Sequence, residues 1–266
     1  FQCQFTIRSK NTMRVEGKNA VITGGAGGIG AAIAEVFLGE GASNVVIADL
    51  DGDRVASVAK ELGVPGFQCD VTEETDIKDL ISSVEDRYGA IDVFVSNAGV
   101  FRLGGEESSD NDWLLNWNIH VMAHVYAARV LAPVMAKRGS GYLVNTSSAA
   151  GLLMHVNSAT YSVTKHGAVA FAEYLAATYG PSGVRVSVLC PQAVRTAMTA
   201  GRDQGVASVD GMLEPEQLAA CVLDTMDREE FLILPHPEVL EYMQRKVGDY
   251  DRWLRGMARL KSEFTT

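Results

Sequence analysis

Short, continuous apolar runs alternate with longer amphipathic segments along most of this chain. Most of the runs are β-branched and continuous rather than alternating with polar residues, which is typical of strands covered on both faces. They lie at residues 20–22, 45–48, 66–69, 93–95, 142–144, 184–189 and 231–234. Helices are predicted between them, at about 28–40, 51–62, 73–88, 110–138, 159–180 and 214–228. This alternation predicts an α/β fold, a doubly wound sheet of about seven parallel strands with helices on both faces.

Length and composition favour a single domain over residues 13–266. The chain has 266 residues, and its 47% hydrophobic content against 21% charged residues excludes disorder. Residues 1–12 lack an organised pattern and are interpreted as a natural extension or a remnant of expression. After residue 235 the apolar residues recur at helical spacing and predict one extra amphipathic helix over about 236–264. This helix would pack on its own domain or on a sister subunit, with membrane-surface binding as the alternative.

Charge and cysteine usage exclude several classes of partner. A net charge of −10 argues against nucleic acid, which needs a concentrated basic surface. We read no apolar run approaching the roughly 18 residues of a membrane span. Cys3, Cys69, Cys190 and Cys221 lie far apart and form no zinc-binding spacing, so no metal site is expected. Reduced thiols of this kind indicate a cytoplasmic protein.

A glycine-rich turn lies between the first predicted strand and its helix. Residues 23–30 read Thr-Gly-Gly-Ala-Gly-Gly-Ile-Gly. Small residues there let the backbone approach a pyrophosphate, whose charge meets free amides at the helix start. The pattern predicts a Rossmann-like dinucleotide site, although a glycine-rich turn can also bind nothing.

An acidic residue at the end of the second predicted strand indicates which dinucleotide would bind. Asp49 follows the turn by about 19 residues and can accept both hydroxyls of an adenosine ribose. Its charge would repel a 2′-phosphate, and no arginine or lysine follows it directly. The sequence therefore favours NAD over NADP, unless Asp49 only caps the following turn.

A tyrosine and a lysine open the fifth predicted helix at positions i and i+4. Tyr161 and Lys165 therefore share one helix face. An ammonium and an oxidised nicotinamide would both favour the phenolate and lower the pKa of Tyr161 toward a useful range. Ser148, which follows the preceding strand, could donate to a substrate oxygen. Taken alone, a Tyr-x-x-x-Lys pair is common on helix surfaces, so the combination carries the argument.

These motifs together resemble the classical short-chain dehydrogenase/reductase family over nearly all of residues 15–235. The resemblance implies that Ser148, Tyr161 and Lys165 are catalytic. It also implies a set of residues around the cofactor, with Asp70 and Val71 beside the adenine and Thr196 near the nicotinamide. The candidate cofactor-binding residues are Gly24, Gly28, Ile29, Gly30, Asp49, Asp70, Val71, Asn97, Ala98, Gly99, Tyr161, Lys165 and Thr196.

The sequence departs from the family pattern at three positions. Ser96 replaces an asparagine before the Asn-Ala-Gly segment, and Gln192 replaces a glycine, so its turn must avoid positive φ or accept strain. His120 falls where the family has a catalytic asparagine that anchors a relay water. We count His120 as a fourth catalytic candidate, because an imidazole of near-neutral pKa can hold water or relay a proton. The alternative is a packing histidine with no part in turnover.

The expected activity is NAD-dependent interconversion of a secondary alcohol and a ketone. Candidate substrate-facing residues such as Val100, Phe101, Leu152 and Leu153 are apolar, which favours a hydrophobic small-molecule substrate. The alternatives are a non-catalytic NAD-binding sensor or scaffold, and an isomerase or dehydratase that retains its cofactor. The resemblance further implies a homodimer or homotetramer.

Overall fold

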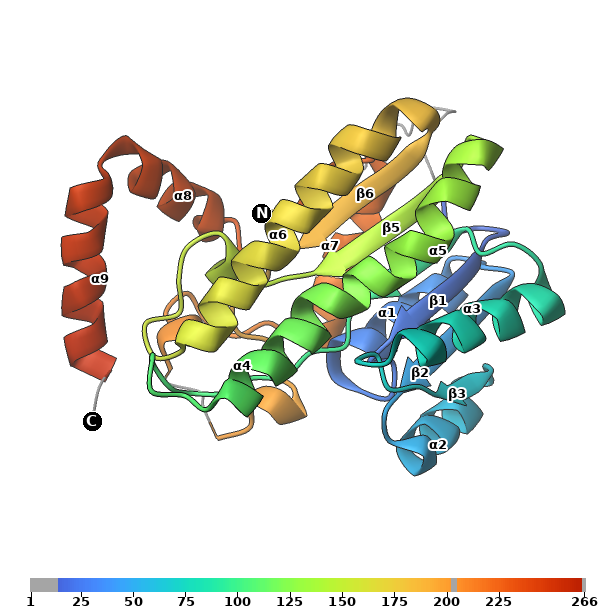
Figure 1. Ribbon diagram of the computed structural model, residues 1–266, viewed down its shortest axis with the longest axis horizontal. Coiled ribbons are helices and arrows are strands. Elements are labelled where there is room, and N and C mark those ends of the chain that lie inside the picture. Colours follow the sequence, from blue (N-terminus) through green and yellow to red (C-terminus); the bar gives the residue numbers. More distant parts are fainter. Residues whose placement is uncertain (1–13, 202–204, 265–266) are drawn as a thin grey trace.

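The computed structural model describes residues 14–201 and 205–264, and residues 1–12 lie outside this part. Its seven strands form one parallel sheet in the order β3-β2-β1-β4-β5-β6-β7 (Figure 1). The strands are β1 (Asn19–Thr23), β2 (Asn44–Asp49), β3 (Gly66–Gln68), β4 (Val93–Ser96), β5 (Gly141–Thr146), β6 (Val184–Leu189) and β7 (Leu232–Ile233). All seven apolar runs coincide with strands, which confirms the predicted doubly wound α/β sheet. The strand order reverses between β1 and β4, where such sheets bind ligands at their carboxyl ends.

Helices cover both faces of the sheet and enclose two apolar cores. The helices α1 (Gly28–Gly39), α2 (Gly52–Leu62) and α7 (Pro215–Asp227) pack on one face. The other face carries α3 (Glu74–Tyr88), α4 (Asp110–Trp117), α5 (Ala123–Arg138) and α6 (Ala159–Tyr179) (Figure 1). Fully buried Phe37 fills the first core and Leu131 the second. The inner strands β1, β2, β4, β5 and β6 are therefore buried on both sides, as their continuous hydrophobic runs predict, while Gly66 and Gln68 of the edge strand β3 are exposed.

The predicted helix over 110–138 is interrupted by a π-helical turn. Asn118–Met122 form this turn between α4 and α5, and His120 lies inside it. π turns often occur at functional sites, because they insert one residue and re-aim the neighbouring side chains. The stretch Asp110–Arg138 is also long and apolar enough to cross a membrane, which corrects the expectation that no run approaches that length. Its most apolar window is 56% buried within the protein, where it packs on the sheet.

The C-terminal segment forms two helices, and the prediction of one continuous helix is wrong. The helices α8 (Glu238–Gly248) and α9 (Tyr250–Phe264) form an arm at the left of the molecule (Figure 1). Asp249 separates them with an extended backbone, at φ −154° and ψ 91°. Its carboxylate accepts a hydrogen bond from the Arg252 amide at 2.9 Å and so caps α9. Apolar periodicity continued through this break and therefore concealed it.

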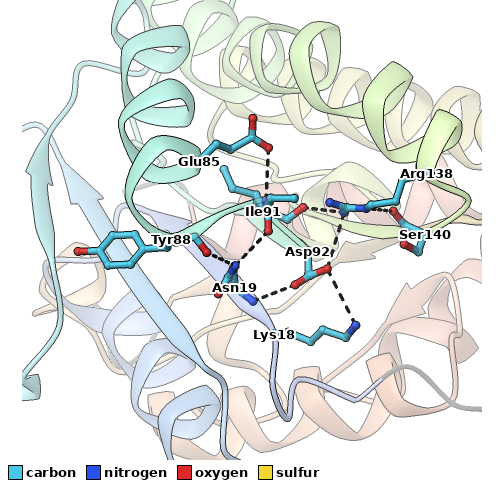
Figure 2. A network of polar contacts seen from close by, with 9 residues as sticks. Lys18, Asn19, Glu85, Tyr88, Ile91, Asp92, Arg138 and Ser140 are labelled. Atoms are coloured by element: carbon cyan, nitrogen blue, oxygen red, sulfur yellow. Dashed lines mark hydrogen bonds and ion pairs between the residues drawn. The ribbon is translucent and has the colours of Figure 1, made fainter.

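A polar network closes the amino ends of the strands (Figure 2). Asp92 accepts a hydrogen bond from the Asn19 amide at 3.1 Å. It also faces the cations of Lys18 and Arg138, at 3.9 and 3.7 Å. Arg138 Nη2 donates to the carbonyl of Ile91 at 2.8 Å. These contacts join the starts of β1 and β4 to the end of α5. They lie at the amino ends of these strands, opposite the carboxyl ends.

Candidate active site

The turn between β1 and α1 has the geometry of a phosphate cradle. Gly24 has φ +63°, and a Cβ there would lie 2.8 Å from the Cα of Ala98. A methyl group on Gly30 would overlap the carbonyl oxygen of Gly24 and approach Asn97 Nδ2 at 2.8 Å. Gly27 precedes α1, whose described N-terminus has no side-chain cap. The close packing and the amides at the helix start fit a dinucleotide pyrophosphate.

Residues 97–99 are hydrogen-bonded to this turn. The Asn97 amide donates to Thr23 Oγ1 at 3.0 Å, and Asn97 Nδ2 donates to the carbonyls of Thr23 and Gly24 at 3.1 and 3.3 Å. Thr146 Oγ1 at the end of β5 donates to Asn97 Oδ1 at 3.4 Å. The carboxyl ends of β1, β4 and β5 are thus held together by one amide side chain.

Asp49 lies beside the glycine turn, as its sequence position suggests. Its Oδ2 accepts a hydrogen bond from the Ala26 amide at 3.1 Å. Arg54, in the first turn of α2, also approaches the turn, because a methyl group on Gly27 would overlap its Nη2. Sequence reasoning missed Arg54, since it sought basic residues only within the turn and directly after Asp49. Its place three residues after the α2 cap, Asp51, was the available signal.

The other candidate cofactor residues lie around the same edge. Asp70 Oδ1 accepts hydrogen bonds from the Thr72 amide and hydroxyl at 2.9 and 2.7 Å, while Val71 is buried. A Cβ on Gly28 would lie 3.0 Å from Thr196 Cγ2, so the Thr196 segment reaches the glycine turn. Ile29 packs partly buried against the core on the α1 face.

Lys165 is buried at the carboxyl end of β5. The residue is 3% exposed, and Nζ donates to the carbonyl of Thr146 at 2.9 Å. Burial lowers the pKa of Lys165 to about 7. Near pH 7 the neutral amine and the ammonium of Lys165 are therefore close in free energy.

Tyr161 lies one turn before Lys165 on α6. Ser158 caps this helix by accepting a hydrogen bond from the Tyr161 amide at 3.2 Å. Lys165 Nζ lies 5.6 Å from the centroid of the Tyr161 ring. Burial raises the pKa of Tyr161 above its ordinary value of 10.0, and hydrogen bonding with the Ser148 side chain only partly offsets this rise. The expected lowering of this pKa is therefore not produced by the protein's own groups.

Ser148 is fixed close to α6 by the packing of its neighbours. Ser148 Oγ donates to the carbonyl of Pro191 at 3.3 Å and accepts from the Ala150 amide at 3.1 Å. Ser147 Oγ donates to the carbonyl of Lys165 at 2.8 Å. A Cβ on Gly151 would lie 2.5 Å from that same carbonyl oxygen, so only glycine permits this approach.

His120 is fully buried within the π turn, and both of its ring nitrogens are engaged. Nε2 accepts a hydrogen bond from the Val100 amide at 3.2 Å, which assigns the proton to Nδ1, 2.9 Å from Thr164 Oγ1. The Thr164 hydroxyl in turn donates to the carbonyl of Thr160 at 2.8 Å. Burial and the nearby Lys165 hold the pKa of His120 well below its usual range. The near-neutral pKa expected from the sequence is therefore wrong.

An aromatic group surrounds the phenol of Tyr161. The Phe101 ring meets the Tyr161 and His155 rings edge-on, with centroids 5.0 Å apart in both pairs. The His120 ring also meets Tyr161, with centroids 5.3 Å apart.

Gln192 follows β6, and among the described residues only Glu229 is a non-glycine residue with positive φ. The replacement of glycine by Gln192 therefore imposes no left-handed strain.

Comparison with known proteins agrees with this geometry. The family model described as short chain dehydrogenase matches residues 18–207. The chain belongs to the short-chain dehydrogenase/reductase family. This is a family of oxidoreductases, and it includes dehydrogenases that act on alcohols. Among the described residues of this family member, no group of three or more His, Cys, Asp or Glu side chains could hold a metal ion.

Several relatives align with most of this short-chain dehydrogenase/reductase. The 1-deoxy-11-beta-hydroxypentalenate dehydrogenase of Streptomyces exfoliatus is 33% identical and covers 85% of this chain and 86% of its own. Momilactone A synthase of Oryza sativa subsp. japonica is 36% identical, with 71% of each chain covered. A short chain dehydrogenase/reductase from Burkholderia phymatum, solved in complex with NAD, has a TM-score of 0.82 at 28% identity, covering 90% of this chain and 96% of its own. L-sorbose reductase from Gluconobacter frateurii, solved with NADPH and L-sorbose, has a TM-score of 0.74 at 27% identity, covering 84% and 97%.

The buried amine predicts a pH-dependent stability. Between pH 7 and 10.5 the unfolded chain holds a proton on Lys165 that the native protein has released, so the free energy of unfolding rises with pH in this window. Below pH 7 the lysine is charged in both states and contributes no slope. Lys165→Met should remove the rise, which we expect to reach about 3 kcal/mol between pH 6 and 9. Urea unfolding across this range measures it.

The exposed Lys137 on α5 provides the control for this measurement. Lys137→Met should leave the pH dependence of the wild type intact. Parallel curves for the wild type and Lys165→Met would show that the pKa of Lys165 is not lowered in the native protein.

Proposed function

We propose that this protein is an NAD-dependent oxidoreductase that interconverts a hydrophobic secondary alcohol and a ketone. The observation that carries the proposal is the placement of Ser148, Tyr161 and Lys165 at one end of the sheet, next to the glycine cradle. The centroid of the Tyr161 ring lies 5.6 Å from Lys165 Nζ, and the neighbouring Ser147 holds Ser148 against the same helix. The aromatic residues around the phenol favour an apolar substrate.

The protein's residues would bind and orient the substrate and move one proton. Ser148 Oγ would donate to the substrate oxygen, and Tyr161 would take the hydroxyl proton in oxidation or return it in reduction. Lys165 would stabilise the phenolate and reach the nicotinamide ribose from its place beside residues 97–99. When bound, a nicotinamide would accept or supply the hydride. Its oxidised form would also supply a positive charge that favours the phenolate.

NAD is proposed as the preferred cofactor because of Asp49. Its carboxylate lies beside the glycine turn, where it can accept the ribose hydroxyls and repel a 2′-phosphate. Arg54 lies at the same turn and is the one observation that would favour NADP. NAD binds the Burkholderia relative, and NADPH is present in the Gluconobacter structure, so cofactor choice has to be measured on this chain.

Turnover should depend on the phenol of Tyr161. We expect Tyr161→Phe to lower kcat by about 1,000-fold, because the proton donor and acceptor is lost while the ring remains. The assay is NADH absorbance with a library of hydrophobic secondary alcohols, alongside NAD affinity, which should change less than about twofold. Tyr250→Phe, at an exposed tyrosine of α9, is the matched control. Full activity in Tyr161→Phe would refute the mechanism, and a wild type that binds NAD without any turnover would favour the sensor or scaffold alternative.

The affinities for the two dinucleotides should differ. We expect NAD to bind at least about tenfold more tightly than NADP, a difference of about 1.4 kcal/mol. Asp49→Asn should narrow this ratio by removing the repulsive charge. Calorimetric titration of the wild type, Asp49→Asn and Arg54→Gln measures each contribution. Equal affinities in the wild type, with NADP binding lost in Arg54→Gln, would overturn the preference for NAD.

A further inference from the structure

The C-terminal arm, α8 and α9, lies beyond residues 18–207 that match the family model. It contacts the two backbone segments on either side of the candidate site. One, the Ser148 segment, comprises residues 148–153, and the other, the Gln192 segment, comprises residues 191–195 after β6. The motifs of the sequence analysis assign the arm no function. Its hydrogen bonds to the rest of the described protein go to the residues after Ser148, to Asp210, which binds Gln192, and to α6. At the end of α9, the Phe264 carbonyl accepts a hydrogen bond from Asn157 Nδ2 at 3.1 Å, just before α6.

Lys246 of α8 binds the segment that follows Ser148. Its Nζ donates to the carbonyls of Leu152 and Leu153 at 2.8 and 3.0 Å. A third contact, at 3.5 Å, is to His166 Nε2, an acceptor because Nδ1 of the same ring donates to the carbonyl of Ser162. One ammonium therefore uses its three donors to join α8 to the Ser148 segment and to α6. Charge-assisted hydrogen bonds of this kind are stronger than neutral ones.

Tyr242 of α8 binds the second segment through a carboxylate. Its hydroxyl donates to Asp210 Oδ1 at 2.8 Å, and Gln192 Nε2 donates to Asp210 Oδ2 at 2.9 Å. Burial and this carboxylate raise the pKa of Tyr242, so its phenol remains a donor. The Gln192 amide also donates to His236 Nδ1 at 3.3 Å, just before α8. Gln192 stands where the family has glycine, and its side chain is what makes the Asp210 contact possible.

Apolar packing supports the same connection. Val239 of α8 is fully buried and belongs to a small core with Ala149 and Leu153, which follow Ser148. Tyr242 and Trp253 pack around this core. The arm therefore contacts the residues directly after Ser148 with both polar and apolar groups.

We propose that α8 is an intramolecular brace that positions the Ser148 and Gln192 segments relative to each other, with Lys246 and Tyr242 as positioning residues. Loop segments that are not held must be ordered at each turnover, and small misplacements of a reacting group reduce rates strongly. The proposal rests on the proposed function for its kinetic consequence. Its structural consequence, the local rigidity of the two segments, can be measured without a substrate.

Hydrogen exchange of the protein without ligands tests the brace directly. Lys246→Met keeps the apolar stem and removes the donors, and we expect the amides of residues 148–153 to exchange about tenfold faster. Tyr242→Phe removes only the hydroxyl and should accelerate exchange in residues 191–195. Arg255→Met and Tyr250→Phe, at exposed residues of α9, are the matched controls and should change neither segment. Peptides from β1 and α1 should exchange as in the wild type.

Kinetics then separates this proposal from the proposed function. We expect Lys246→Met to lower kcat for the alcohol about tenfold while NAD affinity stays within about twofold, because Lys246 binds the residues after Ser148 and α6 rather than the glycine turn. Unchanged exchange in both segments, or acceleration spread equally over β1 and α1, would overturn the brace. Faster local exchange in a protein that turns over no alcohol would support the brace and refute the proposed function.

Discussion

Lys165 carries an amine into the interior of the protein, where Nζ donates to the carbonyl of Thr146 at the end of β5. Removing an ammonium from water is costly, and the lowered pKa of about 7 reflects that cost. The backbone around it is arranged accordingly. Ser147 binds the Lys165 carbonyl, and Gly151 lets the Ser148 segment lie directly against α6. The position of Ser148 relative to Tyr161 therefore follows from how the lysine and its helix are packed.

The parallel sheet explains why these groups meet. The strand order reverses between β1 and β4, and the carboxyl ends of β1, β4 and β5 lie side by side, where sheets of this kind bind ligands. Asn97 joins these three ends through Thr23 and Thr146. The polar network around Asp92 joins the opposite, amino ends of β1 and β4 (Figure 2). Hydrogen bonds therefore hold both ends of these central strands, and the proposed brace, α8, would position the segments beyond their carboxyl ends.

Much of this arrangement could be predicted from the sequence because its signals are local. Short apolar runs, most of them β-branched, located the strands, and the glycine turn, Asp49 and the Tyr161–Lys165 spacing located the candidate residues. The signals failed where tertiary contacts decide. Apolar periodicity could not reveal the break at Asp249 or the π turn at His120, since both keep the apolar face continuous.

Electrostatic properties were the least predictable from sequence. The sequence predicted that Lys165 and an oxidised nicotinamide together lower the pKa of Tyr161, but in the protein alone burial raises it. The near-neutral pKa predicted for His120 is wrong, because burial lowers it. Arg54 approaches the glycine turn from outside the motifs, and Lys246 binds Leu152 and Leu153, which are far from it in the sequence. Neither contact could be predicted from residue spacing. Such effects depend on how deeply a group is packed, which residue spacing alone does not encode.

The protein alone holds Tyr161 protonated, and we expect the positive charge of an oxidised nicotinamide to make the phenolate beside Lys165 accessible. Ultraviolet difference titration of the wild type against Tyr161→Phe isolates this phenol. Without dinucleotide its midpoint should lie above 10, and saturating NAD⁺ should lower it by about two pH units. The same midpoint with and without NAD⁺ would contradict the account.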